Sequence, residues 1–170
     1  MITNSRSDNV NTRNLVVDIL LAVTRDGAFS HIAIRDVLDK YRYLPKQDRA
    51  FITRLSQGTI ERMIELDAII NQFSKTKVKK MKPVIAAILR SGVYQLKYMD
   101  SVPDSAACNE AVKLTVKRGF GGLKGFVNGV MRTIARNMDQ IRYPDAEKEP
   151  VRYLSVKYSI PEWLVQRFTE

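Results

Sequence analysis

The sequence contains very few of the residue types from which many active sites and metal centres are built. Its 170 residues include one cysteine, one histidine and one tryptophan. A single cysteine excludes an internal disulfide and favours a reducing compartment, so we expect a cytoplasmic protein. One histidine and one cysteine are too few for an ordinary Cys/His metal site. We therefore expect neither a metal nor a cofactor in this chain.

Long apolar runs and strand signals are also missing. The longest apolar stretch, 15–23, is interrupted by Asp18 and is much shorter than the ~20 residues that a membrane span needs. The first ten residues are polar and lack the apolar core of a signal peptide. No run alternates apolar and polar residues between turn pairs, as a strand would. We expect no membrane association and no sheet.

Acidic residues are scarce relative to basic ones. The chain has 28 Lys and Arg against 18 Asp and Glu, which gives a net charge of +10 and a sequence pI near 9.8. This excess favours a polyanionic partner, although net charge alone does not separate RNA from DNA or an acidic membrane surface. With 45% hydrophobic residues, the chain is expected to fold around a real core.

Helical periodicity, in contrast, runs from end to end. Apolar residues recur three and four positions apart, which is typical of amphipathic helices that bury one side. The spacing, capping residues and prolines predict helices at about 12–26, 31–41, 45–73, 83–96, 104–118 and 126–134, with two more pieces in 150–170 divided at Pro161. The sequence therefore predicts an all-α bundle of seven or more helices. Within the long helix at 45–73, Gly58 marks either a kink or a close approach of another helix.

The few candidate catalytic residues have simpler interpretations. His31 is expected to flank the second helix, and Cys108 to pack on a helix wall. The glycines at 119, 121 and 122 lack the preceding strand and downstream acid of a dinucleotide site, so they indicate a helix–helix turn. The carboxylates of Glu61, Glu65 and Asp67 are expected on a solvated face. We predict no catalytic residue in this chain.

Two segments hold the excess positive charge. Lys75, Lys77, Lys79, Lys80 and Lys82 fall within eight residues between two predicted helices. From Glu110 to Asp139 no acidic residue intervenes, although that segment contains six cations, Lys113, Lys117, Arg118, Lys124, Arg132 and Arg136.

Two like charges that are four residues apart lie on the same face of a helix, and their repulsion destabilises an isolated helix by a few tenths of a kcal/mol. A bound phosphate chain would neutralise these charges and replace the repulsion with a favourable interaction. For the lysines of 75–82, solvation of the surface explains the charge as well as RNA binding does. Phe120 could either contact a base or pack on the core. Asn128 is expected to be buried. Arg6 and Arg13 could extend the basic surface. The predicted RNA-binding residues are Arg13, Lys117, Arg118, Lys124, Arg132, Arg136, Lys75, Lys77, Lys79 and Lys80.

The order of several motifs resembles the NusB fold family. The long helix of that family resembles three motifs of this chain, Asp48-Arg49-Ala50-Phe51, Leu55-Ser56-Gln57-Gly58-Thr59 and Leu66-Asp67. The next helix of the family and the residues that end it resemble the segments 89–96 and 102–103. The segments 109–112 and 125–132 resemble its closing helix pair. Together these motifs cover about residues 11–137 in the family's order. The resemblance implies a NusB-like helical bundle that binds RNA.

Residues 153–165 extend past the usual end of a free-standing NusB. This tail, with its Pro161-Glu162-Trp163-Leu164 segment, resembles the link into the catalytic part of the RsmB (Sun/Fmu) type of ribosomal RNA 5-methylcytosine methyltransferase. That resemblance implies a flexible arm at 1–10, an RNA-binding domain at 11–140, and the start of a linker at 141–170. It also implies that the S-adenosylmethionine pocket and nucleophilic cysteine of that family lie downstream, so Cys108 does not inherit that role.

The resemblance thus implies a non-catalytic accessory domain that docks small-subunit ribosomal RNA for cytosine-5 methylation. Its expected partners are that RNA and the protein's own C-terminal methyltransferase domain, and no DNA partner is expected. One alternative is a NusB-type antitermination factor that binds RNA with a ribosomal protein. Another is an intramolecular scaffold, in which the apolar tail around Trp163 and Leu164 is an interface.

Overall fold

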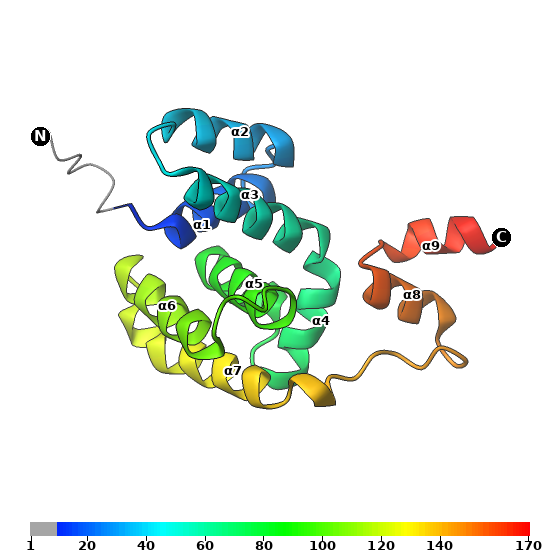
Figure 1. Ribbon diagram of the computed structural model, residues 1–170. Helices are drawn as coiled ribbons and strands as arrows, with labels where there is room; N and C mark the ends of the chain where they lie inside the picture. Colours follow the sequence, from blue (N-terminus) through cyan, green and yellow to red (C-terminus); the bar gives the residue numbers. More distant parts are fainter. Residues whose placement is uncertain (1–9) are drawn as a thin grey trace, which may run out of the picture.

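The computed structural model describes residues 10–170, and helices make up all the regular structure in that range (Figure 1). In chain order the elements are α1 (Thr12–Thr24), α2 (Ser30–Lys40), α3 (Lys46–Glu61), α4 (Met63–Phe73), η1 (Val78–Lys80), α5 (Pro83–Tyr98), α6 (Asp104–Lys117), η2 (Gly121–Leu123), α7 (Lys124–Arg136), η3 (Met138–Gln140), α8 (Pro150–Tyr158) and α9 (Glu162–Thr169). The predicted all-α bundle of seven or more helices is confirmed. The predicted arm at 1–10, including Arg6, lies outside the described residues except for position 10.

Helix α5 is the centre of the bundle. It begins with Pro83, which is tolerated in a first turn, and it packs against α1, α3, α4, α6 and α7. A helix with so many neighbours is buried around most of its circumference, so its sequence is apolar or small on several faces. Gly92 shows the consequence, since a Cβ at this position would lie 2.6 Å from the Cε atom of Met131 on α7.

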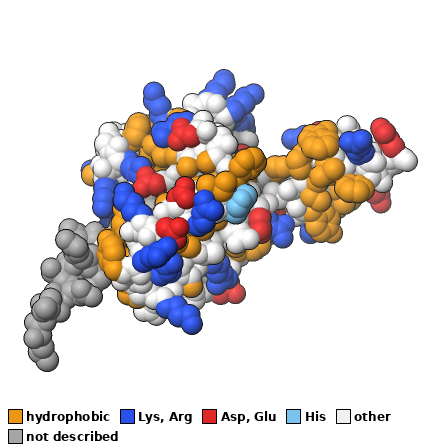
Figure 2. All heavy atoms as spheres, turned by 90° about the horizontal axis from the view of Figure 1, so that it is seen from above, with side chains coloured by type: hydrophobic (Ala, Val, Ile, Leu, Met, Phe, Trp, Pro, Cys, Tyr) orange, Lys and Arg blue, Asp and Glu red, His pale blue; other side chains and the backbone are white. Residues whose placement is uncertain are grey.

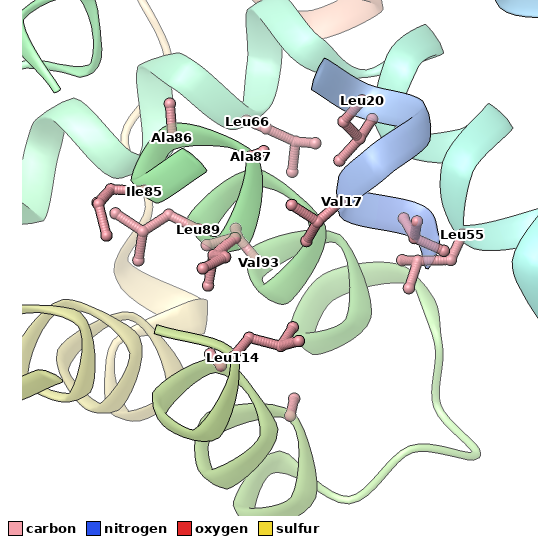
Figure 3. Packing of buried hydrophobic residues seen from close by; sticks show 14 of the residues in the cluster. Val17, Leu20, Leu55, Leu66, Ile85, Ala86, Ala87, Leu89, Val93 and Leu114 are labelled. Carbon is pink, nitrogen blue, oxygen red and sulfur yellow. The ribbon is translucent and has the colours of Figure 1, made fainter. Parts of the chain in front are cut away.

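The core forms where α5 meets its neighbours. Figure 3 shows Val17 and Leu20 of α1 and Leu66 of α4 on one side of α5, with Leu114 of α6 on another. All four side chains are at most 2% exposed. Burial of one such aliphatic side chain contributes about 1.5–3 kcal/mol, so these contacts fix the helical frame that carries the basic residues.

The segment 45–73 forms two helices, so the prediction of one long helix is wrong. The chain leaves helical geometry at Arg62, whose φ and ψ are −103° and 15°, and this residue separates α3 from α4. Gly58 is not the break. A Cβ there would lie 2.2 Å from the ring of Tyr94, so glycine is needed for the close approach of α3 to α5.

The tail packs on the bundle before it projects away from it. Helix α8 contacts α4, whereas α9 packs on α8 (Figure 1). Gln72 on α4 donates to the carbonyl of Arg142 at 2.7 Å and accepts from its amide at 2.9 Å. At the end of α8, Ser159 has a φ of 53°, and its Oγ accepts the amide of Ile64 at 3.1 Å. The tail therefore caps the start of α4.

Candidate nucleic-acid interface

Helices α6 and α7 form an antiparallel hairpin that carries half of the predicted RNA-binding cations, three of them at its turn. We call residues 117–124, the turn with its two flanking helix ends, the hairpin tip. Gly119 has a φ of +86°, a left-handed conformation that glycine adopts without strain, and it ends α6. The turn therefore places Lys117 at the end of one helix and Lys124 at the start of the next.

The outer seam of this hairpin carries a row of polar and cationic side chains. Arg132 on α7 donates to Asn109 on α6 at 2.7 Å and to Asn128 at 3.2 Å. In steps of four residues, Lys113 and Lys117 follow Asn109 on one face of α6, and Lys124 and Asn128 precede Arg132 on one face of α7. Both acceptors of Arg132 are neutral amides, and among residues 10–170 no carboxylate forms an ion pair with it.

Asn128 itself is exposed, so the prediction that it is buried is wrong. The inner face of α7 is formed instead by Val127, Val130, Met131 and Ile134. Asn128 falls on the opposite face, one turn after Lys124, because residues four apart lie on the same side of a helix. The surrounding sequence contains enough apolar residues to fill the core without it.

Lys117, Lys124 and Arg136 are exposed, and no carboxylate of residues 10–170 lies within 4.0 Å of their charged groups. Lys113 makes only an exposed contact with Glu110 at 3.5 Å. Such exposed pairs contribute little energy. The first turn of α7 has no acidic residue and no side-chain cap, so its positive dipole end adds to the charge of Lys124. This surface can attract an anion without breaking a strong internal ion pair.

Arg118 lies beside these cations but faces inward. Its guanidinium donates to the Oδ1 and the carbonyl of Asn14 at 2.7 and 2.9 Å, and to Asp18 at 2.6 Å. The side chain is only 19% exposed. Arg118 therefore ties the end of α6 to the first half of α1, and RNA contact by this residue stays a prediction.

Arg13 is also held by the protein. Its Nε donates to Oε1 of Gln95 at 2.8 Å, and its guanidinium lies 5.1 Å from the centre of the Phe51 ring. Burial lowers the pKa of Arg13, partly offset by the attraction of Glu110. These contacts join α1 to α3 and α5. Phe120, for which packing and base contact were both open, packs against the core.

The basic loop, residues 75–82, lies in a different part of the molecule. Val78, the first residue of η1, is buried, while Lys75, Lys77, Lys79 and Lys80 around it are exposed. Val78 lines one hollow with Thr24 at the C-terminal end of α1, whereas Arg118 contacts the N-terminal half of that helix.

The hairpin tip and the basic loop are therefore near opposite ends of α1. A helix of 13 residues rises 1.5 Å per residue, which separates its ends by roughly 20 Å. Arg136 is three turns of α7 away from Lys124 and so is not part of the tip either. The structure places Lys117 and Lys124 on the two helix ends that flank the same turn, but it does not bring all predicted cations onto one site.

Two of the three carboxylates predicted on a solvated face are not there. Glu65 is 2% exposed and accepts hydrogen bonds from the hydroxyls of Tyr98 and Tyr143, the latter at 3.1 Å. Asp67 forms a two-point ion pair with Arg90 at 2.6 and 2.8 Å. Only Glu61 is exposed as predicted. Burial and the neighbouring Glu65 carboxylate raise the pKa of Tyr143 to about 12, and the same causes raise that of Tyr98.

The buried position of Glu65 gave no clear sequence signal because its partners are far along the chain. Tyr98 and Tyr143 are 33 and 78 residues away. The contact of Arg142 with α4 was missed for the same reason. Tertiary pairing over such separations leaves no periodic pattern within a single segment.

The remaining candidate groups are placed as follows. Cys108 is fully buried, and its burial raises the thiol pKa, which disfavours the reactive thiolate. His31 is exposed in the first turn of α2, where it stacks with Phe29. Among residues 10–170, no three His, Cys, Asp or Glu side chains are grouped to hold a metal ion. Over the same range, no helix combines the length and apolar character that crossing a membrane requires.

The bundle and its hairpin tip define a class of small all-α domains that present cations on a rigid helical frame. Within that class, the chain belongs to the NusB family, whose family model matches residues 10–136. The resemblance drawn from the motifs is confirmed.

Curated relatives fall into two groups. The chain is 35% identical over 158 residues to the probable ribosomal RNA small subunit methyltransferase B of Bacillus subtilis (strain 168), covering 93% of this chain and 34% of that protein. A protein of the same name from Synechocystis is 35% identical over 162 residues, covering 95% and 35%. The transcription antitermination protein NusB of Agathobacter rectalis is 39% identical over 90 residues, covering 52% and 69%. The chain thus spans about a third of the length of these methyltransferases.

Solved structures share the fold. The crystal structure of the antitermination factors NusB and NusE in complex with dsRNA matches with a TM-score of 0.68 at 21% identity, covering 74% of this chain and 93% of that chain. The crystal structure of PH0851 matches with a TM-score of 0.70 at 16% identity, covering 94% and 35%. The second match therefore includes most of the tail as well as the bundle.

Proposed function

We propose that this chain is a non-catalytic RNA-binding domain that docks small-subunit ribosomal RNA for cytosine-5 methylation. In this proposal the catalytic domain lies elsewhere on a longer polypeptide, where S-adenosylmethionine supplies the methyl group. The exposed cations of the hairpin tip and its seam contact phosphates, and the bundle fixes their spacing. Because the contacts go to phosphates, the domain contributes affinity and orientation, while selection of the target base falls to the catalytic domain.

The observation that carries this proposal is the uncompensated positive charge along the α6–α7 seam. Lys117 and Lys124 flank the turn of the hairpin, and both hydrogen-bond acceptors of Arg132 are neutral. Coverage of the relatives supports the methyltransferase context. The two methyltransferases match 93–95% of the chain, tail included, whereas the Agathobacter NusB matches 52%.

The test compares RNA binding by the native chain and by Lys117→Ala/Lys124→Ala across a salt series. Arg118 and Arg13 are left unchanged because their loss would disturb folding as well as binding. On single-stranded RNA, each lost phosphate contact lowers the salt slope by about 0.7 and the affinity about fivefold at 0.1 M salt. Fluorescence anisotropy with a labelled small-subunit ribosomal RNA segment measures both quantities.

Arg35→Ala/Lys46→Ala is the matched control, since it removes the same charge from the exposed surface of α2 and α3. We expect this control to bind almost as tightly as the native chain. Equal losses in the two variants would show that only net charge matters and would remove the tip from the interface. A strong preference for one short RNA that increases with an added ribosomal protein would favour antitermination instead.

The tail supports a second candidate function, that of a scaffold for the catalytic domain. Trp163 is 63% exposed and Phe168 is 81% exposed, and both lie on the projecting α8–α9 arm, where Figure 2 shows clustered hydrophobic side chains. Exposed apolar clusters of this kind mark interaction surfaces.

The test of the scaffold function measures the sedimentation of this chain over a range of concentrations. If the arm is an interface, the chain self-associates as concentration rises, and Trp163→Asp/Phe168→Asp prevents it. A monomer at all concentrations, together with no binding to the separate catalytic domain, would contradict the scaffold function.

A further inference from the structure

A hollow lined by both charged and apolar side chains lies between α4 and the segment 142–156. Its volume is about 710 Å³, within the usual range of ligand sites. The residues of segment 142–156 that line this hollow lie beyond the family model, which ends at residue 136, and outside the hairpin tip. The charged residues that line it are Asp67, Lys77, Arg142, Glu149 and Arg152.

The two walls of the hollow are fixed to each other by hydrogen bonds. Gln72 holds the backbone of Arg142 in two directions, and Tyr143 donates to the buried Glu65 carboxylate at 3.1 Å. The backbone on the tail side is therefore anchored, while the side chain of Arg142 stays exposed. Such anchoring forms the hollow before any ligand arrives, which reduces the ordering cost of binding.

The charge left over in the hollow is positive. Asp67 is neutralised by Arg90 at 2.6 Å, and Glu149 by Arg152 at 3.3 Å. Lys77 donates to the carbonyl of Asn71 at 3.0 Å, a neutral acceptor that leaves its charge uncompensated. Within residues 10–170 no carboxylate lies within 4.0 Å of the Arg142 guanidinium. Two cations without an ion pair among residues 10–170 thus line one preformed hollow.

The hollow is continuous with the basic loop. Lys77 belongs to both, and the exposed Lys75, Lys79 and Lys80 follow on the same short segment. A small anion would contact only the two cations in the hollow. A nucleic-acid strand, with one phosphate at every nucleotide, would contact these two cations and the lysines of the basic loop.

We propose that this basic hollow binds phosphates of a nucleic-acid strand, with Arg142 and Lys77 as the contacts and the basic loop guiding the strand into it. The planar guanidinium of Arg142 can pair with two phosphate oxygens, whereas Lys77 acts as a point charge. The proposal rests on the proposed RNA-binding function and gives it a second surface that includes the tail.

Lysine footprinting tests both surfaces at once. The native 170-residue chain is treated with an acetylating reagent with and without an RNA oligonucleotide, and mass spectrometry follows each lysine. We expect RNA to slow acetylation several-fold at Lys77 and Lys79, as well as at Lys117 and Lys124. Lys46 on α3 is the internal control and is expected to react at the same rate in both samples.

The outcomes separate the two proposals. Protection at Lys117 and Lys124 alone overturns the basic hollow but leaves the tip interface in place. Protection at Lys77 and Lys79 alone supports the hollow and overturns the tip. Protection at neither overturns both. Pyrophosphate that protects Lys77 as well as RNA does, at equal phosphate concentration, overturns the strand as the ligand.

A variant of the arginine completes the test. Arg142→Ala keeps both backbone hydrogen bonds to Gln72, so we expect it to fold normally and to weaken RNA protection of Lys77 about fivefold at 0.1 M salt. Arg142→Lys keeps the charge and should restore part of that protection. Unchanged protection of Lys77 in Arg142→Ala would overturn the role of Arg142.

Discussion

At the residue scale, the arginines of this domain divide into those that hold the fold and those that face solvent. Arg118 donates to Asn14 and Asp18, while Arg136 on the neighbouring helix is exposed without an ion pair among residues 10–170. Both are cations in an acid-free stretch, so sequence alone treats them alike. Their effects on stability should differ.

We expect Arg118→Ala to lower the free energy of unfolding by about 1–3 kcal/mol, because it removes charge-assisted hydrogen bonds to α1. Arg136→Ala is the matched control and should change it by less than about 0.5 kcal/mol. Urea unfolding followed by circular dichroism measures both. If Arg118→Ala is as stable as the native chain, its internal contacts contribute nothing and its guanidinium is free for RNA.

Tyr143 should make stability depend on pH in the alkaline range. Burial and Glu65 raise its pKa from 10 to about 12, so the folded protein stabilises the neutral phenol. That contribution is complete below pH 10 and is lost as the pH rises through 12. We expect Tyr143→Phe to lose about 1 kcal/mol or more at pH 7 and to unfold with a shallower pH dependence between pH 10 and 12.

Urea unfolding at several pH values measures this dependence, and Tyr43→Phe is the control because Tyr43 is 48% exposed. The native chain and Tyr43→Phe should show the same alkaline slope. A Tyr143→Phe slope equal to theirs would mean that the phenol is no better stabilised in the folded state than in the unfolded state.

At the element scale, the segment between α7 and α8 is attached to α4 by hydrogen bonds. Its attachment depends on Gln72, which holds Arg142 by two hydrogen bonds across 70 residues of sequence. A loop that lacks regular structure is otherwise a preferred site of proteolysis. Cleavage after Arg142 therefore reports whether the segment is docked.

We expect Gln72→Ala to be cut by trypsin after Arg142 several times faster than the native chain. Gln57→Ala is the matched control, because Gln57 is exposed on α3 and bonds only to Glu61 one turn away. Mass spectrometry of the early fragments identifies the cut. Equal cleavage in the native chain and both variants would show that the segment is already open in solution.

At the scale of the whole molecule, the positive charge is distributed over two regions near opposite ends of α1. The ends of this helix are roughly 20 Å apart, a length of about six nucleotides at 3.4 Å each. A shorter RNA can occupy one region at a time. A longer RNA can occupy both, and the second contact then benefits from a high effective concentration.

We therefore expect affinity to rise steeply as a single-stranded RNA lengthens from about 4 to about 12 nucleotides. Lys75→Ala/Lys79→Ala/Lys80→Ala should remove most of that rise and barely affect the shortest RNA. Anisotropy titrations with oligonucleotides of increasing length measure this. A gradual rise that is identical in the native chain and the variant would contradict a two-region surface.

Much of this architecture was predictable from local pattern. The apolar spacing gave the helices, and Pro83, Pro103 and Pro161 gave three of their starts, because these signals act within a few residues. The break at Arg62 was not predictable, since apolar residues continue on the same face through it. The amide of Ile64, just after this break, donates to Ser159, which is 95 residues further along the chain.

For the candidate site, only the segments rich in positive charge were predictable from the sequence. The acid-free stretch from Lys113 to Arg136 correctly located the exposed cations of the α6–α7 hairpin. It did not reveal that Arg118 has internal partners, because Asn14 and Asp18 lie on another helix. A charge pattern shows where cations are abundant, whereas their availability depends on tertiary neighbours.

The bond between Ser159 and Ile64 has a consequence for the cooperativity of unfolding. The family model ends at residue 136, but the first turn of α4 is completed by a residue of the tail. When the tail opens, the amide of Ile64 loses its acceptor and exchanges its hydrogen with water. The protection of that amide therefore reports the opening of a segment 95 residues away, which lies outside the domain that the family model defines.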